Sequence, residues 1–115
     1  MGTLVTTPLF GSIVSAAGGV YTSKPRPVLI FQNTALMTGE STVVVPFTSQ
    51  NQPGASFRVP VKPTDANGLD RDCWLEIDKI GAIRTSWIGP VIGKLEGEPL
   101  YEATRLVRQL LNLER

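Results

Sequence analysis

The chain has 115 residues, of which 42% are apolar, and its formal net charge is +1, from 11 basic and 10 acidic side chains. A chain of this size usually folds around one core, so we expect residues 1–115 to form a single domain. The overall charge predicts neither a nucleic-acid nor a membrane partner, and no apolar run approaches the roughly 18 residues that a membrane span needs. Because the chain has no histidine, any acid–base chemistry must use other groups.

Charge is unevenly distributed along the chain. Residues 1–64 contain Lys24, Arg26, Arg58 and Lys62 against the single acid Glu40, and most acids follow later. A localised basic face on a nearly neutral protein is compatible with a short nucleic-acid contact, but also with a merely solvated surface.

The single cysteine and the first residues indicate the compartment. Cys73 cannot form an intramolecular disulfide and precedes Trp74 in an apolar run, so we expect a buried thiol in a reducing cytoplasm. Residues 1–10 lack the basic and apolar regions of a signal peptide, and we interpret them as an N-terminal extension.

The expected strands are short and separated by turns rich in glycine, proline and asparagine. In chain order they are residues 12–16, 28–32, 42–47, 57–62, 73–77, 81–83 and 88–92. Runs 28–32 and 42–47 are continuously apolar and rich in β-branched residues, which predicts strands buried on both faces. The alternating pattern of 57–62 predicts a strand with one solvated face.

The periodicity changes at the C-terminal end of the chain. Residues 98–113 are expected to form an amphipathic helix, with Pro99 in its first turn and an apolar face of Leu100, Ala103, Val107 and Leu110. Short strands followed by one helix indicate a mainly β fold, a small barrel or sandwich that the helix caps.

Several segments occur in an order and spacing that resemble the PemK/MazF toxin family. They are Gly11-Ser12-Ile13-Val14, Arg26-Pro27-Val28-Leu29-Ile30, Pro46-Phe47-Thr48-Ser49 and Asp78-Lys79-Ile80, followed by the terminal helix. The resemblance implies an SH3-like small β-barrel with a C-terminal helix. It further implies a homodimeric, metal-independent endoribonuclease without a cofactor, which cuts single-stranded RNA at short sequences and is blocked by a cognate antitoxin.

In this family the ribose 2′-hydroxyl attacks the adjacent phosphate, and the resemblance assigns Arg26, Thr48 and Ser49 to that reaction. A guanidinium suits phosphate oxygens and stays charged, so Arg26 is expected to stabilise negative charge rather than transfer a proton. Hydroxyls can donate to phosphate without adding charge. The alternatives are an ion pair for Arg26 and turn-forming hydrogen bonds for Thr48 and Ser49.

The remaining candidates are less specific. Asp78 aligns with an aspartate that some members of the family use as the base, or else it pairs with Lys79 or Arg84. Lys24, Lys79 and Arg84 either attract phosphate or are solvated, and Gln50 either contacts a base edge or is an exposed loop residue.

Two tryptophans could stack on nucleobases. Trp74 lies in an apolar run, so we expect it in the core, and for Trp87 we expect core or dimer packing. The family often has an acidic residue where Ser12 stands, and some of its members have an arginine where Glu76 stands. The sequence, which has no histidine, does not identify the general acid.

Two other functions remain as alternatives. A gyrase-poisoning toxin of the same barrel fold would act through aromatic and apolar residues at its extreme C-terminus, and the ending Asn112-Leu113-Glu114-Arg115 argues against this alternative. A non-catalytic SH3-like module would only bind a peptide or nucleic acid. No cluster of residues has the spacing of metal ligands, so no metal is predicted.

Overall fold

The computed structural model describes residues 8–18, 24–37 and 39–114. Within these residues the secondary structure consists of β1 (Ser12–Ala16), β2 (Arg26–Ile30), η2 (Thr34–Leu36), β3 (Ser41–Thr48), β4 (Arg58–Val61), β5 (Cys73–Glu76), η3 (Ile77–Lys79), β6 (Gly81–Arg84), η4 (Thr85–Trp87), β7 (Ile88–Lys94) and α1 (Glu98–Leu110). The mainly β fold with one C-terminal helix is therefore confirmed. No helix in this part of the chain is long and apolar enough to cross a membrane.

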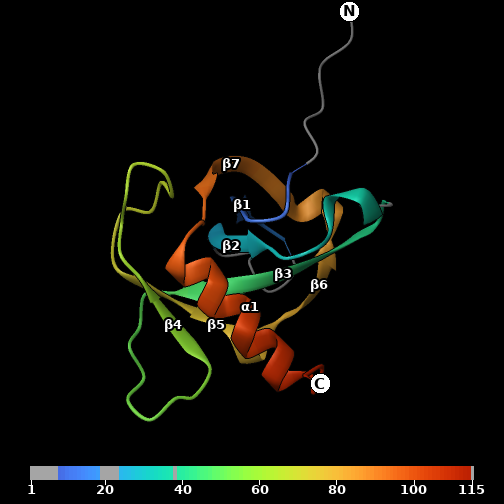
Figure 1. Ribbon diagram of the computed structural model, residues 1–115. Coiled ribbons are helices and arrows are strands. Elements are labelled where there is room, and N and C mark those ends of the chain that lie inside the picture. The colour runs from blue at the N-terminus through green and yellow to red at the C-terminus, as the bar shows by residue number, and fades with distance from the viewer. Residues whose placement is uncertain (1–7, 19–23, 38, 115) are drawn as a thin grey trace, which may run out of the picture.

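The strands form one antiparallel sheet in the order β4-β5-β3-β2-β1-β7, and β6 also pairs with β3 (Figure 1). The long strand β3 joins two parts of the sheet. Its first half pairs with β6, its middle with β2, and its end with β5. Because β2 and β3 are antiparallel, the start of β2 lies beside the end of β3.

Backbone ladders do not close the barrel, because no pairing joins β7 to β4 within the described residues. The connection between β4 and β5 fills this gap instead. The Lys94 backbone N–H donates to the Ala66 carbonyl at 2.9 Å. The connection therefore packs against β7 and forms a wall at this end of the barrel.

The core consists of two clusters on opposite faces of the central strands. Leu29 belongs to the larger cluster, whereas Val28 and Ile30 belong to the smaller one, so β2 is buried on both faces as predicted. Ala103 and Val107 of α1 complete the larger cluster, and α1 packs against β4 and η3 (Figure 1).

The helix is shorter than predicted, since α1 ends at Leu110 rather than at residue 113. Asn112 adopts the left-handed conformation, with a φ of 58°. The Leu113 N–H reaches back to the Arg108 carbonyl at 2.8 Å, as in a Schellman ending. The pattern of leucines continues beyond this point, but the backbone does not continue as a helix.

The prediction for Trp74 was wrong, and that for Cys73 was confirmed. Cys73 is buried in the larger cluster together with Leu75. Trp74 is only half-buried and belongs to neither cluster. Alternating side chains of a strand point to opposite faces, so Trp74 lies on the face of β5 away from the larger cluster.

Residues 1–7 of the expected N-terminal extension lie outside the described residues.

Candidate functional site

A cavity of about 300 Å³ opens where β2 begins and β3 ends. Four of the predicted site residues line it: Lys24, Arg26, Thr48 and Ser49. The other wall comes from the β4–β5 connection, the start of β5 and β7, and contributes Gly68, Leu69, Asp70, Arg71, Cys73 and Ile92. The four predicted residues are thus brought together, although they come from two separate parts of the chain.

The register of β2 and β3 explains why Arg26 and Thr48 meet. Val28 pairs with Pro46, and continuing this register toward the start of β2 brings Arg26 opposite Thr48. Pro25 and Pro27 flank Arg26 and restrict the backbone there to extended conformations. The Arg26 side chain is exposed at the strand end, where its charge is available to an anion.

The cavity is predominantly cationic. Its lining holds three cations, Lys24, Arg26 and Arg71, and one carboxylate, Asp70. Arg71 Nε donates to Asp70 Oδ1 at 3.1 Å. This hydrogen bond and the charge of Arg71 lower the pKa of the Asp70 carboxyl, and the charge of Lys24 adds to the effect. The site therefore offers several donors to an anionic group such as a phosphate.

Sequence reasoning missed Asp70 and Arg71. Asp70 is one of the acids that follow residue 64, and Arg71 stands between it and Asp72, two residues before β5 begins. The position of this segment was the available signal. In an antiparallel sheet, the start of β5 lies beside the end of β3, where Thr48 was already a candidate.

The Thr48 hydroxyl has a local partner and also lines the cavity. Its Oγ1 accepts from the Gln50 backbone N–H at 3.1 Å, which is the turn-forming bond named above as the alternative. A hydroxyl that accepts one bond can still donate its own hydrogen. Thr48 can therefore shape the turn and donate to a bound group. The exposed Gln50 does not line the cavity.

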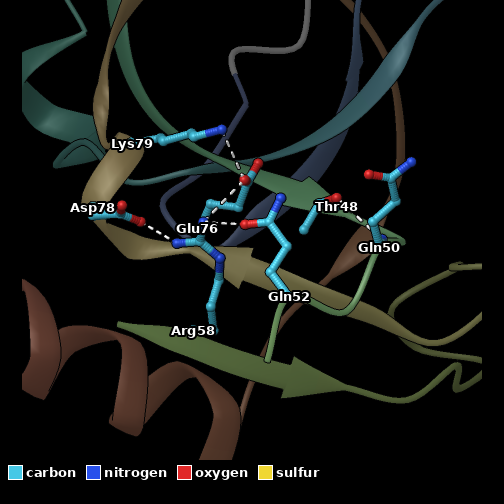
Figure 2. A network of polar contacts seen from close by, with 7 residues as sticks. All are labelled: Thr48, Gln50, Gln52, Arg58, Glu76, Asp78 and Lys79. Carbon is cyan, nitrogen blue, oxygen red and sulfur yellow. Dashed lines mark hydrogen bonds and ion pairs between the residues drawn. The ribbon is translucent and has the colours of Figure 1, made fainter. Parts of the chain in front are cut away.

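Asp78 lies in a different cluster, centred on Arg58 (Figure 2). It forms an ion pair with Arg58, not with Lys79 or Arg84, which corrects the expected pairing. Arg58 also lies 3.4 Å from a Glu76 carboxylate oxygen, and Glu76 lies 3.1 Å from Lys79 Nζ. Arg58 and Glu76 are cross-strand neighbours, and η3 directly after β5 brings Asp78 back over Arg58. The sequence offered no signal for this register.

Neither Lys79 nor Arg84 joins the cavity. Lys79 is half of the pair with Glu76, and Arg84 lines a separate hollow with Glu40 and Thr85. Among the residues that the structure describes, no three or more His, Cys, Asp or Glu side chains are grouped so that they could hold a metal ion.

Comparison with known proteins identifies the family. Residues 10–111 match the family described as "PemK-like, MazF-like toxin of type II toxin-antitoxin system". A curated relative, the probable endoribonuclease MazF of Mycolicibacterium smegmatis, is 34% identical over 99 residues, which cover 86% of this chain and 91% of the relative.

Solved structures share the fold. An endoribonuclease in complex with its cognate antitoxin from a mycobacterial species has a TM-score of 0.76 at 20% identity and covers 96% of this chain and 99% of its own. The Mycobacterium tuberculosis toxin MazF-mt6 has a TM-score of 0.74 at 24% identity, covering 90% and 99%. The MazF complex with MazE of Deinococcus radiodurans has a TM-score of 0.74 at 21% identity, covering 93% and 97%. The chain therefore belongs to the PemK-like and MazF-like toxins of type II toxin–antitoxin systems.

Proposed function

We propose that this protein is an endoribonuclease that cleaves single-stranded RNA, without a metal ion, in the cavity where β2 begins and β3 ends. The supporting observation is that Arg26 and Thr48 line one cavity together with Lys24 and Arg71. The name of the relative from Mycolicibacterium smegmatis, probable endoribonuclease, agrees with this assignment.

In the proposed reaction the ribose 2′-oxygen loses its proton and attacks the adjacent phosphorus. The bond from phosphorus to the 5′-oxygen breaks, which leaves a 2′,3′-cyclic phosphate and, after proton gain, a free 5′-hydroxyl. Negative charge on the non-bridging oxygens increases in the transition state, so donors placed there accelerate the reaction. Arg26 and Arg71 supply charged donors, and the Thr48 hydroxyl, with Ser49 beside it, supplies neutral ones.

Asp78 is not the base in this proposal. Its carboxylate forms an ion pair with Arg58, and Asp78 is not among the residues that line the cavity. A general base must lie within hydrogen-bond reach of the proton that it removes, directly or through one water. Lys79 and Arg84, which also lie outside the cavity, are likewise not assigned to the scissile phosphate.

We further infer that the protein acts in the cytoplasm as a homodimer, and that a cognate antitoxin binds it and restrains it. The family description names a toxin–antitoxin system, one structural neighbour is described in complex with its cognate antitoxin, and another is described as MazE-MazF.

The test is cleavage of a mixed-sequence single-stranded RNA in EDTA, with the 5′ ends of the products mapped. We expect discrete cuts that carry 5′-hydroxyls and are lost in Arg26→Ala. Arg84→Ala is the matched control, because it removes an exposed arginine outside the cavity, and it should cleave normally. Intact RNA combined with inhibition of gyrase would favour the gyrase-poisoning alternative instead.

A further inference from the structure

The strand β5 presents two chemically different faces. Cys73 and Leu75 point into the larger core cluster, whereas Trp74 and Glu76 lie on the opposite face. Glu76 is neutralised there by Arg58 and Lys79. Trp74 is half-buried and packs into neither core cluster. A large aromatic side chain that the core does not use is therefore partly available at the surface.

The register of three strand pairs places Trp74 in line with the candidate site. Trp74 is directly opposite Thr48 of β3 on one side and Pro60 of β4 on the other. Arg26 of β2 continues the same line beyond Thr48. We call Arg26, Thr48, Trp74 and Pro60 the cross-strand row. Directly opposite residues share a face and have Cβ atoms about 4.5–5.5 Å apart, so the Trp74 and Thr48 side chains leave the sheet as neighbours on one face.

The chemistry changes along the cross-strand row. At one end lies the cationic cavity with Arg26, and at the other lies the apolar pair of Trp74 and Pro60. Close to this pair, the charge of Arg58 is already balanced by Glu76 and Asp78 (Figure 2). Trp74 does not line the cavity itself, but its cross-strand neighbour Thr48 does, as does Arg26. The row therefore places the donors of Arg26 and Thr48 next to an uncharged, flat aromatic surface. A single-stranded nucleotide chain has matching chemistry, because each phosphate is followed by an unpaired aromatic base.

We propose that Trp74 stacks on the nucleobase adjoining the scissile phosphate, a role that rests on the proposed function. Stacking accepts every base, because every base has a π-face. The Trp74 subsite therefore contributes affinity and places the phosphate in the cavity, while leaving the choice of base to polar groups.

The test is binding of a single-stranded oligodeoxynucleotide that carries the mapped cleavage sequence. This oligodeoxynucleotide lacks the 2′-hydroxyl, so the proposed reaction cannot cut it. The chain has two tryptophans, so Trp87→Phe leaves Trp74 as the only indole fluorophore. We expect binding to quench the fluorescence of that variant. Trp87→Phe should otherwise bind and cleave as the unmodified protein does, since Trp87 is on η4, outside the cross-strand row.

Trp74→Ala should weaken binding by about 5- to 150-fold, the range measured for loss of one aromatic–base stack. Trp74→Phe should recover most of that loss, because a smaller ring can still stack. An abasic site at the stacking nucleotide should weaken binding to the unmodified protein, but should add little to the loss in Trp74→Ala. This non-additivity identifies direct contact between the indole and that base.

The other outcomes overturn the inference. Equal affinity of Trp74→Ala and the unmodified protein, with RNA cleavage intact, would overturn the stacking role alone. If the antitoxin no longer inhibits Trp74→Ala while the oligonucleotide affinity of this variant is unchanged, the indole contacts the antitoxin rather than a base. If Trp74→Ala does not fold, the fluorescence and abasic-site measurements on Trp87→Phe still show whether Trp74 stacks on a base. Absence of quenching, together with equal affinity for the abasic oligonucleotide, would overturn the stacking role. If the unmodified protein cuts no RNA, the proposed function falls and this inference with it.

Discussion

Gly68 and Ile92 approach so closely that a Cβ on Gly68 would lie 2.0 Å from the Ile92 carbonyl oxygen. Both residues line the cavity, on the wall that faces Arg26 and Thr48. The width of the candidate site is therefore set by how tightly the β4–β5 connection packs against β7.

Gly68→Ala should destabilise the fold by about 2–4 kcal/mol, because the added methyl group meets backbone that cannot rotate away. Gly68 also has a φ of +69°, which non-glycine residues rarely adopt. Gly54→Ala is the matched control, since Gly54 has a φ of +83° but nothing within 4 Å of the added Cβ. Urea unfolding of both variants separates the steric effect from the conformational one. Equal losses would show that the close approach to Ile92 contributes nothing.

Asn67 organises the same wall from inside. Its buried side chain accepts backbone N–H bonds from Thr64 and Leu69, both at 3.0 Å, and donates to the Lys62 carbonyl at 2.8 Å. Removing it leaves buried backbone groups unpaired, which costs about 1–3 kcal/mol for each group.

Asn67→Ala should therefore lower the free energy of unfolding by at least about 2 kcal/mol and should also weaken RNA cleavage, because the cavity wall loosens. Asn33→Ala is the comparison, since Asn33 caps an exposed 3₁₀ turn with one bond at 2.9 Å and should cost about 1 kcal/mol or less. Calorimetric unfolding of the two variants shows which of them loses more stability. A larger loss in Asn33→Ala would contradict the role assigned to Asn67.

Thr48→Ala should slow RNA cleavage by about 100- to 1000-fold, as expected when one transition-state donor is removed. Thr48→Ser keeps the hydroxyl and should retain most of the activity. Because Thr48 is only half-buried at a strand end, the thermal midpoint should change little. A sharp fall in the midpoint of Thr48→Ala would instead assign the hydroxyl to the turn bond with Gln50.

Asp70→Asn should tighten binding of a single-stranded oligonucleotide at low salt, because the carboxylate of Asp70 competes with phosphate for Arg71. The pKa of Asp70 is lowered, mainly by its hydrogen bond to Arg71. The carboxylate therefore remains ionised through the neutral range and is protonated only below the ordinary value for aspartate.

The difference in affinity between Asp70→Asn and the unmodified protein should therefore be present at neutral pH and should persist to a lower pH than an aspartate with an ordinary pKa would allow. It should disappear only as the pH falls through the lowered pKa of Asp70. Fluorescence titrations at several pH values measure this. Weaker binding by Asp70→Asn at neutral pH would contradict competition for Arg71.

Asp78→Asn should leave the rate of RNA cleavage close to that of the unmodified protein, because Asp78 does not line the cavity. Arg58 keeps its contact with Glu76, so the loss of stability should be about 1 kcal/mol or less. Cleavage rates and thermal midpoints of the two proteins are the measurements. A rate loss of about 100-fold or more would restore Asp78 as the base.

The amino-acid sequence by itself predicted the mainly β fold with its terminal helix, and four of the residues that line the cavity. The apolar run at 28–32 and the amphipathic pattern of α1 are local signals, because side-chain periodicity follows directly from strand and helix geometry. Arg26 and Thr48 were identified from motifs beside strands, and the antiparallel pairing of β2 with β3 brought them together.

Only the tertiary structure decided the rest of the candidate site. Asp70 and Arg71 reach the cavity because the β4–β5 connection packs against β7. Asp78 forms an ion pair outside the cavity because the register of β4 on β5 places Arg58 next to it. Trp74 was misplaced for a related reason, since a short apolar run does not reveal which of its faces the core uses. Registers and loop packing depend on contacts between residues distant in the chain, and local periodicity carries no information about such contacts.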